Sequence, residues 1–385
     1  EKYDFYYILG YLNSKPVGDF LDMFSGTSDY QNIDIKRLPY ISINDSTREH
    51  INNIVQENIL ISKDDWDSKE TSYNFLIHPL IKFKENIPSL ISDSYKNWFD
   101  HTENNFQQLR NNEQEINKLF IDIFGMQDEM SPEISDEDIT ISIAERNRET
   151  RSFLSYFIGC LLGRFSLDCK GIVYAGGKWD DSKYQTFKPN KYGLILLTDE
   201  YYFEDDIIAR LREFLSVTFG EETVEENLQW LAESLEMKQN ETAEERLRRY
   251  FLDEFFKDHC QVYQKRPIYW LVDSGKQKGL RTLIYMHRYQ PDTMATIRFE
   301  HLQEIQTKYN NEIDAVNLRL TNPNLSATEK RELEKRRERF QKRLEELLEF
   351  DKKLAEYANA QIVIDLDDGV KVNYAKFEKV LAKIK

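Results

Sequence analysis

Apolar residues recur every three or four positions along much of this chain, the spacing that is typical of amphipathic helices. Residues 6–24 and 51–59 both show this pattern. Residues 74–124 are rich in Asn, Gln, Glu and Lys with aromatic residues between them, which predicts a long helix or a helical pair. The acidic stretch 128–138 contains Pro132 and is the best candidate for a linker in the first half of the chain.

The middle of the chain alternates between helical and strand-like patterns. Residues 153–165 are strongly apolar with helical periodicity, and small residues at every fourth position (Ser155, Gly159 and Gly163) would let another element approach closely. Residues 171–197 are typical of strands and turns. Three pairs have capping-box spacing and predict helix starts: Ser142 with Glu145, Thr223 with Glu226, and Thr242 with Glu245.

Two short runs further along are rich in β-branched and aromatic residues and predict a pair of strands. They are residues 268–272 and 280–286, and Asp273-Ser274-Gly275 and Gly279 mark a turn between them. Lys276 and Lys278 lie within this turn. The sequence therefore predicts a hairpin that carries lysines on its connecting loop.

From Phe299 the pattern changes to long helices, interrupted at residues 322–324 and restarted by the capping pair Ser326 and Glu329. Apolar residues then recur every seven positions, which predicts coiled-coil packing in an antiparallel helical hairpin: Leu333, Phe340, Leu347 and Leu354. Residues 362–366 and 370–374, separated by Asp367-Asp368-Gly369, predict a β-hairpin before a short last helix.

These patterns predict an α+β protein that is predominantly helical, with small β-hairpins or sheets and a long antiparallel helical hairpin near the C-terminus. We expect three regions. They are 1–138, which is mainly helical; 139–298, an α+β domain with the lysine-bearing hairpin; and 299–385, the helical hairpin followed by the β-hairpin and short helix.

Composition places the chain among globular proteins, with 40% hydrophobic and 13% aromatic residues in 385. The three cysteines are too few and too widely spaced for a disulfide or zinc framework, which indicates a reducing, cytoplasmic location. The longest apolar stretch is too short to span a bilayer, and we expect no membrane partner. The first residue is Glu1 rather than Met, which suggests a piece of a longer protein.

Catalytic signatures are mostly absent from the sequence. It has no P-loop, and Gly176-Gly177 lacks the glycine spacing of a dinucleotide fingerprint. The adjacent His259 and Cys260 would point to different faces of a helix, which argues against a nucleophile pair. Residues 322–325, Asn-Pro-Asn-Leu, lack the second proline and the aromatic residue of the motif that amino-methyltransferases use to hold a base, and are interpreted as a helix break. We therefore predict no catalytic, cofactor-binding or metal-binding residue in this chain.

Charge is unevenly distributed, although the formal net charge is −16. The segment 265–288 carries six cations and a single acid, which is a plausible way to present cations to a polyanion. Its candidate DNA-binding residues are Arg266, Lys276, Lys278, Arg281 and Arg288, mostly as phosphate contacts, and Arg281 or Lys276 could also read a guanine edge. The alternative is a solvated hairpin whose lysines only protect an edge strand.

A second candidate segment, residues 170–192, interleaves lysines with aromatic residues. The lysines would contact phosphates and the rings could pack on sugars or bases: Lys178, Lys183, Lys188 and Lys191 with Tyr174, Trp179, Tyr184, Phe187 and Tyr192. The alternative is a loop whose rings belong to the core. A basic stripe of Lys335, Arg336, Arg339 and Arg343 on the last long helix is equally well explained as a solvated face paired with glutamates.

Several of these segments resemble the C-terminal region of PglX-type adenine-specific DNA methyltransferases of BREX phage-defence systems. The similar segments occur in the same order: 112–134, SYFIGCLLGRFSLD (155–168), AGGKWD (175–180), 199–206, KRPIYWLVDSG (265–275), 283–289 and DLDDGVKVNYAKF (365–377). Upstream, LNSK (12–15) and KRLP (36–39) resemble the closing elements of target-recognition segments in large methyltransferases and restriction specificity subunits, which implies that region 1–138 includes the closing part of such a segment. Together the resemblance covers essentially the whole chain.

The resemblance implies a non-catalytic part of a large enzyme that methylates adenine N6 with S-adenosylmethionine. Its catalytic and cofactor motifs have no counterpart here, so no catalytic residue is carried over. Double-stranded DNA and other BREX proteins are the implied partners. The main rival is a protein-interaction scaffold, in which the helical hairpin and the acidic helices after Glu221 dock other defence proteins or the methyltransferase domain. A third interpretation, an autonomous nuclease, lacks the carboxylate spacing that a Mg²⁺ site needs.

Overall fold

The computed structural model describes residues 4–25 and 29–384 of the chain. The chain divides into two compact units, which are described separately. The helical unit comprises Glu1–Tyr73 and Tyr95–Glu145, and the mixed unit comprises Asn74–Ser94 and Arg146–Lys385. None of the helices in the described ranges is both long and apolar enough to cross a membrane.

The helical unit is built from amphipathic helices around an apolar core. Its helices are α1 (Phe5–Leu12), α2 (Lys15–Phe24), α3 (Asn32–Arg37), α4 (Asp45–Asp67), most of α6 (Ile91–Phe124) and a 3₁₀ turn at Asp136–Asp138. Tyr7, Val55 and Phe120 from three of these helices meet in the core. Asn44 caps α4 by accepting a hydrogen bond from the amide of Thr47 (2.8 Å), which explains why the helix begins there.

The mixed unit is centred on one buried helix. Its first helices are α5 (Pro79–Lys82), α7 (Arg146–Leu162), α8 (Ile207–Phe219), α9 (Val224–Ser234), α10 (Ala243–Asp253) and α11 (Phe255–Val262), with 3₁₀ turns at Asp181–Lys183 and Glu221–Thr223. α7 is buried on nearly all faces from Phe153 onward. Gly159 lies so close to Phe165 that a Cβ at this position would be 2.4 Å from the ring. The small-residue spacing thus corresponds to a close approach.

A three-stranded antiparallel sheet packs within this unit. Its strands are β1 (Leu194–Leu197), β2 (Tyr269–Asp273) and β3 (Arg281–Tyr285), in the order β1-β3-β2. Leu271 lies opposite Leu283, and Leu194 lies opposite Ile284. The predicted strand pair is confirmed. The outer edge of β2 is covered by the C-terminal segment, because the Asp273 amide donates to the Val380 carbonyl (3.0 Å).

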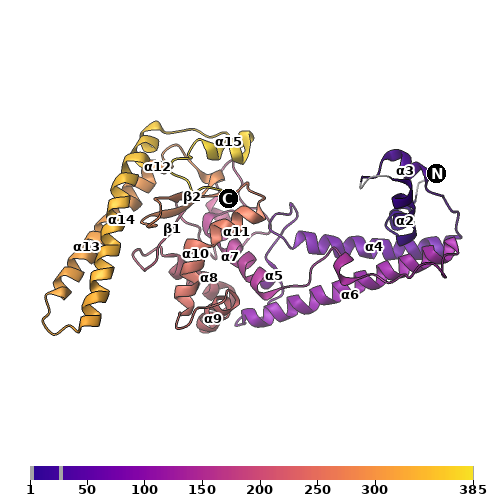
Figure 1. Cartoon of the computed structure of the whole chain (residues 1–385), viewed down its shortest axis with the longest axis horizontal. Coiled ribbons are helices and arrows are strands. Elements are labelled where there is room, and N and C mark those ends of the chain that lie inside the picture. The colour runs from indigo at the N-terminus through magenta and orange to yellow at the C-terminus, as the bar shows by residue number, and fades with distance from the viewer. Residues whose placement is uncertain (1–3, 26–28, 385) are drawn as a thin grey trace. The chain divides into compact units, whose positions relative to one another are not determined.

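The long helical hairpin is also confirmed. α12 (Thr293–Thr296) and a π-helical turn (Ile297–Leu302) lead into α13 (Gln303–Leu320), which packs antiparallel to α14 (Ala327–Ala360), as Figure 1 shows at the C-terminal end of the colour scale. The heptad residues Leu333, Phe340, Leu347 and Leu354 are all buried. Ser326 and Glu329 form the predicted capping box, as do Thr242 and Glu245 at the start of α10.

Two local predictions are wrong, and a third holds only for the position of the helix start. Residues 362–374 do not form a β-hairpin but a 3₁₀ turn (Leu366–Asp368) followed by α15 (Gly369–Ala375), because the Asn373 side chain bonds the carbonyls of Asp365 and Gly369. Ser142 does not cap a helix, since α7 begins only at Arg146. α9 begins directly after Thr223, as predicted, but the Thr223 side chain does not cap it, because its hydroxyl donates to carbonyls of the preceding turn.

Candidate nucleic-acid interface

The cations of segment 265–288 form two groups, separated by strand β3. Arg281 begins β3 beside the turn, whereas Arg288 lies past the other end of the strand, in a 3₁₀ turn (Met286–Arg288). A strand advances about 3.3 Å per residue, so these two side chains belong to different surfaces. Arg266 follows the end of α11 and is exposed. The sequence grouped these residues as one basic hairpin, but they do not form a single patch.

The turn between β2 and β3 is held from both sides. On α14, Glu346 accepts hydrogen bonds from the Ser274 hydroxyl (2.7 Å) and from the amides of Gln277 (2.6 Å) and Gly279 (3.2 Å). Arg281 donates to Asp273 (2.9 Å) and to the Leu252 carbonyl (2.6 Å).

Of the turn's two lysines, Lys278 pairs with Asp253, whereas Lys276 is exposed. Arg281 and Lys278 therefore have structural partners.

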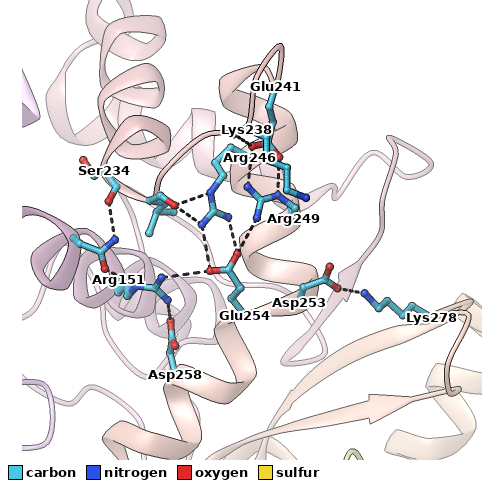
Figure 2. Close-up of polar contacts among 12 residues, drawn as sticks. Arg151, Ser234, Lys238, Glu241, Arg246, Arg249, Asp253, Glu254, Asp258 and Lys278 are labelled. Carbon is cyan, nitrogen blue, oxygen red and sulfur yellow. Dashed lines mark hydrogen bonds and ion pairs between the residues drawn. The ribbon is translucent and has the colours of Figure 1, made fainter.

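Asp253 is next to an arginine network that joins α7, α10 and α11 (Figure 2). Glu254 accepts hydrogen bonds from Arg246 (2.8 and 3.2 Å), Arg249 (3.3 Å) and Arg151 (3.4 Å). Arg246 is only 2% exposed and also donates to the Leu235 carbonyl. A buried guanidinium is stable only when its donors are satisfied, so this network is a structural element of the mixed unit.

Arg288 fixes the other end of the segment. Its guanidinium donates to the carbonyls of Leu162 (3.3 Å), Asn190 (2.8 Å) and Lys191 (2.7 Å) and lies 4.0 Å from the centre of the Trp179 ring. Burial lowers the pKa of Arg288. Asn190 and Lys191 end a second segment, residues 178–191, which carries four lysines. Arg288 therefore has a positioning role, because its contacts hold this segment against the sheet.

The lysine-bearing segment 178–191 keeps its cations exposed: Lys178, Lys183, Lys188 and Lys191. Its backbone is fixed by Asp168, which accepts hydrogen bonds from the amides of Gln185 (2.7 Å) and Thr186 (3.0 Å). Burial would raise the pKa of Asp168, but the hydrogen bonds from Thr186, Gln185 and Ser166 outweigh this effect and lower it. The segment is therefore an ordered loop that presents lysines.

Part of this segment lines a cavity of about 840 Å³. Residues from two distant parts of the chain form its walls: Tyr174, Trp179, Asp181, Ser182, Tyr184, Gln185, Lys188, Pro189, Asn190, Lys191, Tyr192 and Leu194 from one, and Arg288, Gln290, Asp292, Thr293 and Thr296 from the other. Of the predicted site residues, the cavity brings together Lys188, Lys191 and Arg288. The remaining six, at positions 178, 183, 266, 276, 278 and 281, do not line it.

Two aromatic residues of this segment stack inside the wall. Trp179 and Tyr184 are nearly parallel, with ring centroids 4.8 Å apart and an interplanar angle of 9°. Tyr184 is buried, and its hydroxyl donates to the Gly163 carbonyl (2.6 Å), whereas Tyr192 is 38% exposed. Buried Phe187 packs near Phe214. The interpretation of core rings thus holds for Tyr184 and Phe187.

The arginines of the α14 stripe face acidic partners. Arg336 bonds Glu200 (2.7 Å) and Glu312 (2.8 Å), Arg339 bonds Glu200 (3.0 Å), and Arg343 bonds Asp199 (2.9 Å). They join the hairpin to the loop after β1, a role that helical i, i+4 spacing did not reveal. Within the described ranges, no group of three or more His, Cys, Asp or Glu residues is arranged to hold a metal ion.

Sequence reasoning missed Gln290 and Asp292 as cavity residues. They follow a strand and flank a proline, a pattern that indicates only a turn. Their closeness to the lysine-bearing segment depends on β1 and β3 pairing across almost ninety intervening residues, which no local pattern reports.

Comparison with known proteins gives two strong similarities, while no family model matches the chain. The chain is 40% identical over 394 residues to the "Adenine-specific methyltransferase PglX" of Lacticaseibacillus casei (strain Zhang), covering 98% of this chain and 32% of that protein. It is 34% identical over 412 residues to the "Adenine-specific methyltransferase BrxX" of Escherichia coli O9:H4 (strain HS), covering 100% of this chain and 33% of that protein. The chain thus spans about a third of the length of these curated relatives.

Proposed function

We propose that this chain is the region of a PglX- or BrxX-type adenine-specific methyltransferase that holds and positions DNA. The chain is homologous over its full length to about one third of such enzymes. In this proposal the parent enzyme methylates adenine N6 as part of a BREX phage-defence system. The methyl donor, S-adenosylmethionine, and the catalytic residues belong to other parts of the parent. This region contributes contacts to double-stranded DNA and thereby helps to select the methylated site.

One observation carries the proposal: segment 178–191 presents four exposed lysines from a fixed backbone. Among the residues that the structure describes, none of these lysines forms an ion pair with a carboxylate, whereas Lys278 and Arg281 do. Ammonium groups that form no ion pair with a carboxylate can displace the counterions of DNA phosphates, which is the main source of sequence-independent affinity. Lys178, Lys183, Lys188 and Lys191 are therefore our first choice as phosphate contacts, ahead of Arg266 and Lys276, which are also exposed.

The proposal is tested by measuring the affinity of the full-length protein for a fluorescent duplex across a series of salt concentrations. We expect the double variant Lys188→Gln, Lys191→Gln to bind more weakly. The negative slope of log K against log salt should become less steep by about 1.8, or 0.9 for each lost phosphate contact. Lys352→Gln is the matched control, because Lys352 is an exposed lysine on α14 paired with a neighbouring glutamate. An unchanged slope in the double variant would contradict the proposal.

A protein-interaction scaffold remains the second candidate. The observation that favours it is the pairing of Arg336, Arg339 and Arg343, which removes most of the basic stripe from α14, while Leu318 and Leu348 on the hairpin are 73% and 59% exposed. Binding to other defence proteins that is insensitive to salt, together with unchanged DNA affinity in the lysine variants, would support the scaffold and not the DNA-positioning role.

A further inference from the structure

The cavity beside the lysine-bearing segment has the size of a small-molecule site. Its volume of about 840 Å³ lies within the range of about 300–1,000 Å³ that is typical of ligand pockets. A single nucleotide fits such a volume, whereas a double helix does not. The cavity and the exposed lysines therefore offer two different kinds of contact within one surface.

One wall of the cavity is suited to a phosphate. The carbonyls of Lys188 and Lys191 accept hydrogen bonds from Arg210 and Arg288, respectively, so the backbone on both sides of the wall is fixed. The Lys191 ammonium lies 4.8 Å from the centre of the Tyr192 ring and 3.2 Å from its hydroxyl. The ordered backbone places both lysines at the cavity, so that contact with a phosphate costs the side-chain entropy of the lysines and not the ordering of the loop.

Another wall is suited to a base. Gln290 and Asp292 contribute an amide and a carboxylate, and both are exposed. A carboxylate accepts a hydrogen bond from an exocyclic amino group, which adenine, cytosine and guanine carry and thymine lacks. The cavity thus presents both cations and hydrogen-bond acceptors, as the phosphate and the base of a nucleotide require. Each segment contributes charges of both signs, since Asp181 lies with Lys188 and Lys191 and Arg288 lies with Asp292.

Four aromatic residues line the cavity, Tyr174, Trp179, Tyr184 and Tyr192, and Tyr192 is the most exposed of them. Trp179 lies between Tyr184, stacked at 4.8 Å, and the Arg288 guanidinium, 4.0 Å from the ring centre, so its ring already has partners in the wall. Tyr192 is 38% exposed and lines the cavity next to Lys191. A base stacked on Tyr192 would therefore lie beside a phosphate-binding lysine.

We propose that this cavity binds one nucleotide unit, with its phosphate at Lys188 and Lys191, its base on Tyr192 and an amino group of the base at Asp292. The inference rests on the proposed DNA-positioning function, since the nucleotide is supplied by DNA as an unpaired residue next to the duplex that the lysines contact. A free mononucleotide has the same chemistry and is the second possible source.

The test uses the full-length protein and three labelled duplexes that differ only at one position: fully paired, with one bulged adenosine, or with one bulged thymidine. We expect the bulged adenosine to bind about tenfold more tightly than the paired duplex, as stacking on one aromatic ring provides. Tyr192→Ala should abolish this advantage, and Asp292→Asn should reduce the preference for adenosine over thymidine. Tyr201→Ala is the matched control, because Tyr201 is an exposed tyrosine of the same unit that does not line the cavity.

The outcomes separate this inference from the function on which it rests. Equal, salt-dependent binding of all three duplexes would overturn the nucleotide site and leave the DNA-positioning role intact. Absence of salt-dependent binding to any duplex would overturn both. A bulge advantage that survives in Tyr192→Ala would also overturn the site, because the preference would then come from the flexibility of the bulged DNA. Displacement of the bulged duplex by free dAMP in the wild type but not in Tyr192→Ala would support the site and assign it to free nucleotides as well.

Discussion

Replacing Glu254 with alanine removes the common acceptor of the arginine network in Figure 2. Three guanidinium groups donate to this carboxylate, those of Arg151, Arg246 and Arg249. Arg246 is 2% exposed, so water does not readily replace the lost acceptor. The substitution therefore leaves a buried cation with unsatisfied donors between α10 and its neighbouring elements.

The expected magnitude follows from what remains after the substitution. Removing one partner of a fully buried ion pair costs about 3–5 kcal/mol. Here the Glu254 side chain is 27% exposed, and Arg246 keeps its two hydrogen bonds to the Leu235 carbonyl. Both features reduce the cost, so we expect the free energy of unfolding of the mixed unit to fall by about 2–3 kcal/mol. For a unit of this size that corresponds to a decrease in Tm of about 5–10 °C.

The assay is thermal and urea unfolding of the full-length protein, with tryptophan fluorescence as the probe. Glu254→Gln should recover part of the loss, because the amide keeps one acceptor oxygen and the shape of the side chain. Glu349→Ala is the matched control: its carboxylate pairs with Lys352 at a site where both side chains are 71% exposed, and we expect no measurable change in Tm. If Glu254→Ala and Glu349→Ala have the same Tm, the network does not stabilise the fold and the reasoning is refuted.

Three further predictions follow from burial and charge. Hydrogen bonding to Arg249 lowers the pKa of Glu241 to about 2, below its unfolded value of about 4.3. The stabilisation from this ion pair is therefore complete at neutral pH and is lost as the pH falls from about 4.3 toward 2. Over that interval, the free energies of unfolding of wild type and Glu241→Gln, measured with urea, should converge. Cys169 is partly exposed and the other two cysteines are buried, so a thiol reagent should label one site in the native protein and three after unfolding, as counted by mass spectrometry. Phe340→Ala should lower the free energy of unfolding by about 3–5 kcal/mol, whereas Leu348→Ala on the exposed face of the same helix should change it by less than about 0.5 kcal/mol, as measured by urea unfolding.

The helical hairpin was predictable because its signal is local and repeated. Four apolar residues at intervals of seven, with a capping pair ahead of them, specify both a long helix and the face that it buries. Residues 362–374 show the limit of the same reasoning. Two apolar runs around Asp367-Asp368-Gly369 have the pattern of a hairpin, but Tyr374 and Phe377 pack on Trp270 from a helix and the turn after it. Tertiary packing against the sheet prevails over the local preference.

The candidate site was predictable in its residue types but not in its grouping. The predicted strand at residues 280–286 already placed Arg281 and Arg288 at different ends, although the basic segment was treated as one group of candidate residues. Sequence spacing could not identify the partners of the α14 arginines, since Arg343 and Asp199 are 144 positions apart. Partners of this kind are fixed by the fold as a whole.

Arginines and lysines have different structural roles in the mixed unit. A guanidinium offers several donors in a fixed plane, which suits it to satisfy multiple carbonyls or carboxylates, as Arg288 and Arg246 do. A lysine is a compact charge on a flexible stem, and the lysines of segment 178–191 keep that charge in solvent. Arginines thus fix the backbone of the mixed unit, and the lysines extend from it into solvent. An overall charge of −16 is compatible with DNA binding on this basis, because steering of a polyanion depends on the local field of an ordered cationic segment and not on the total.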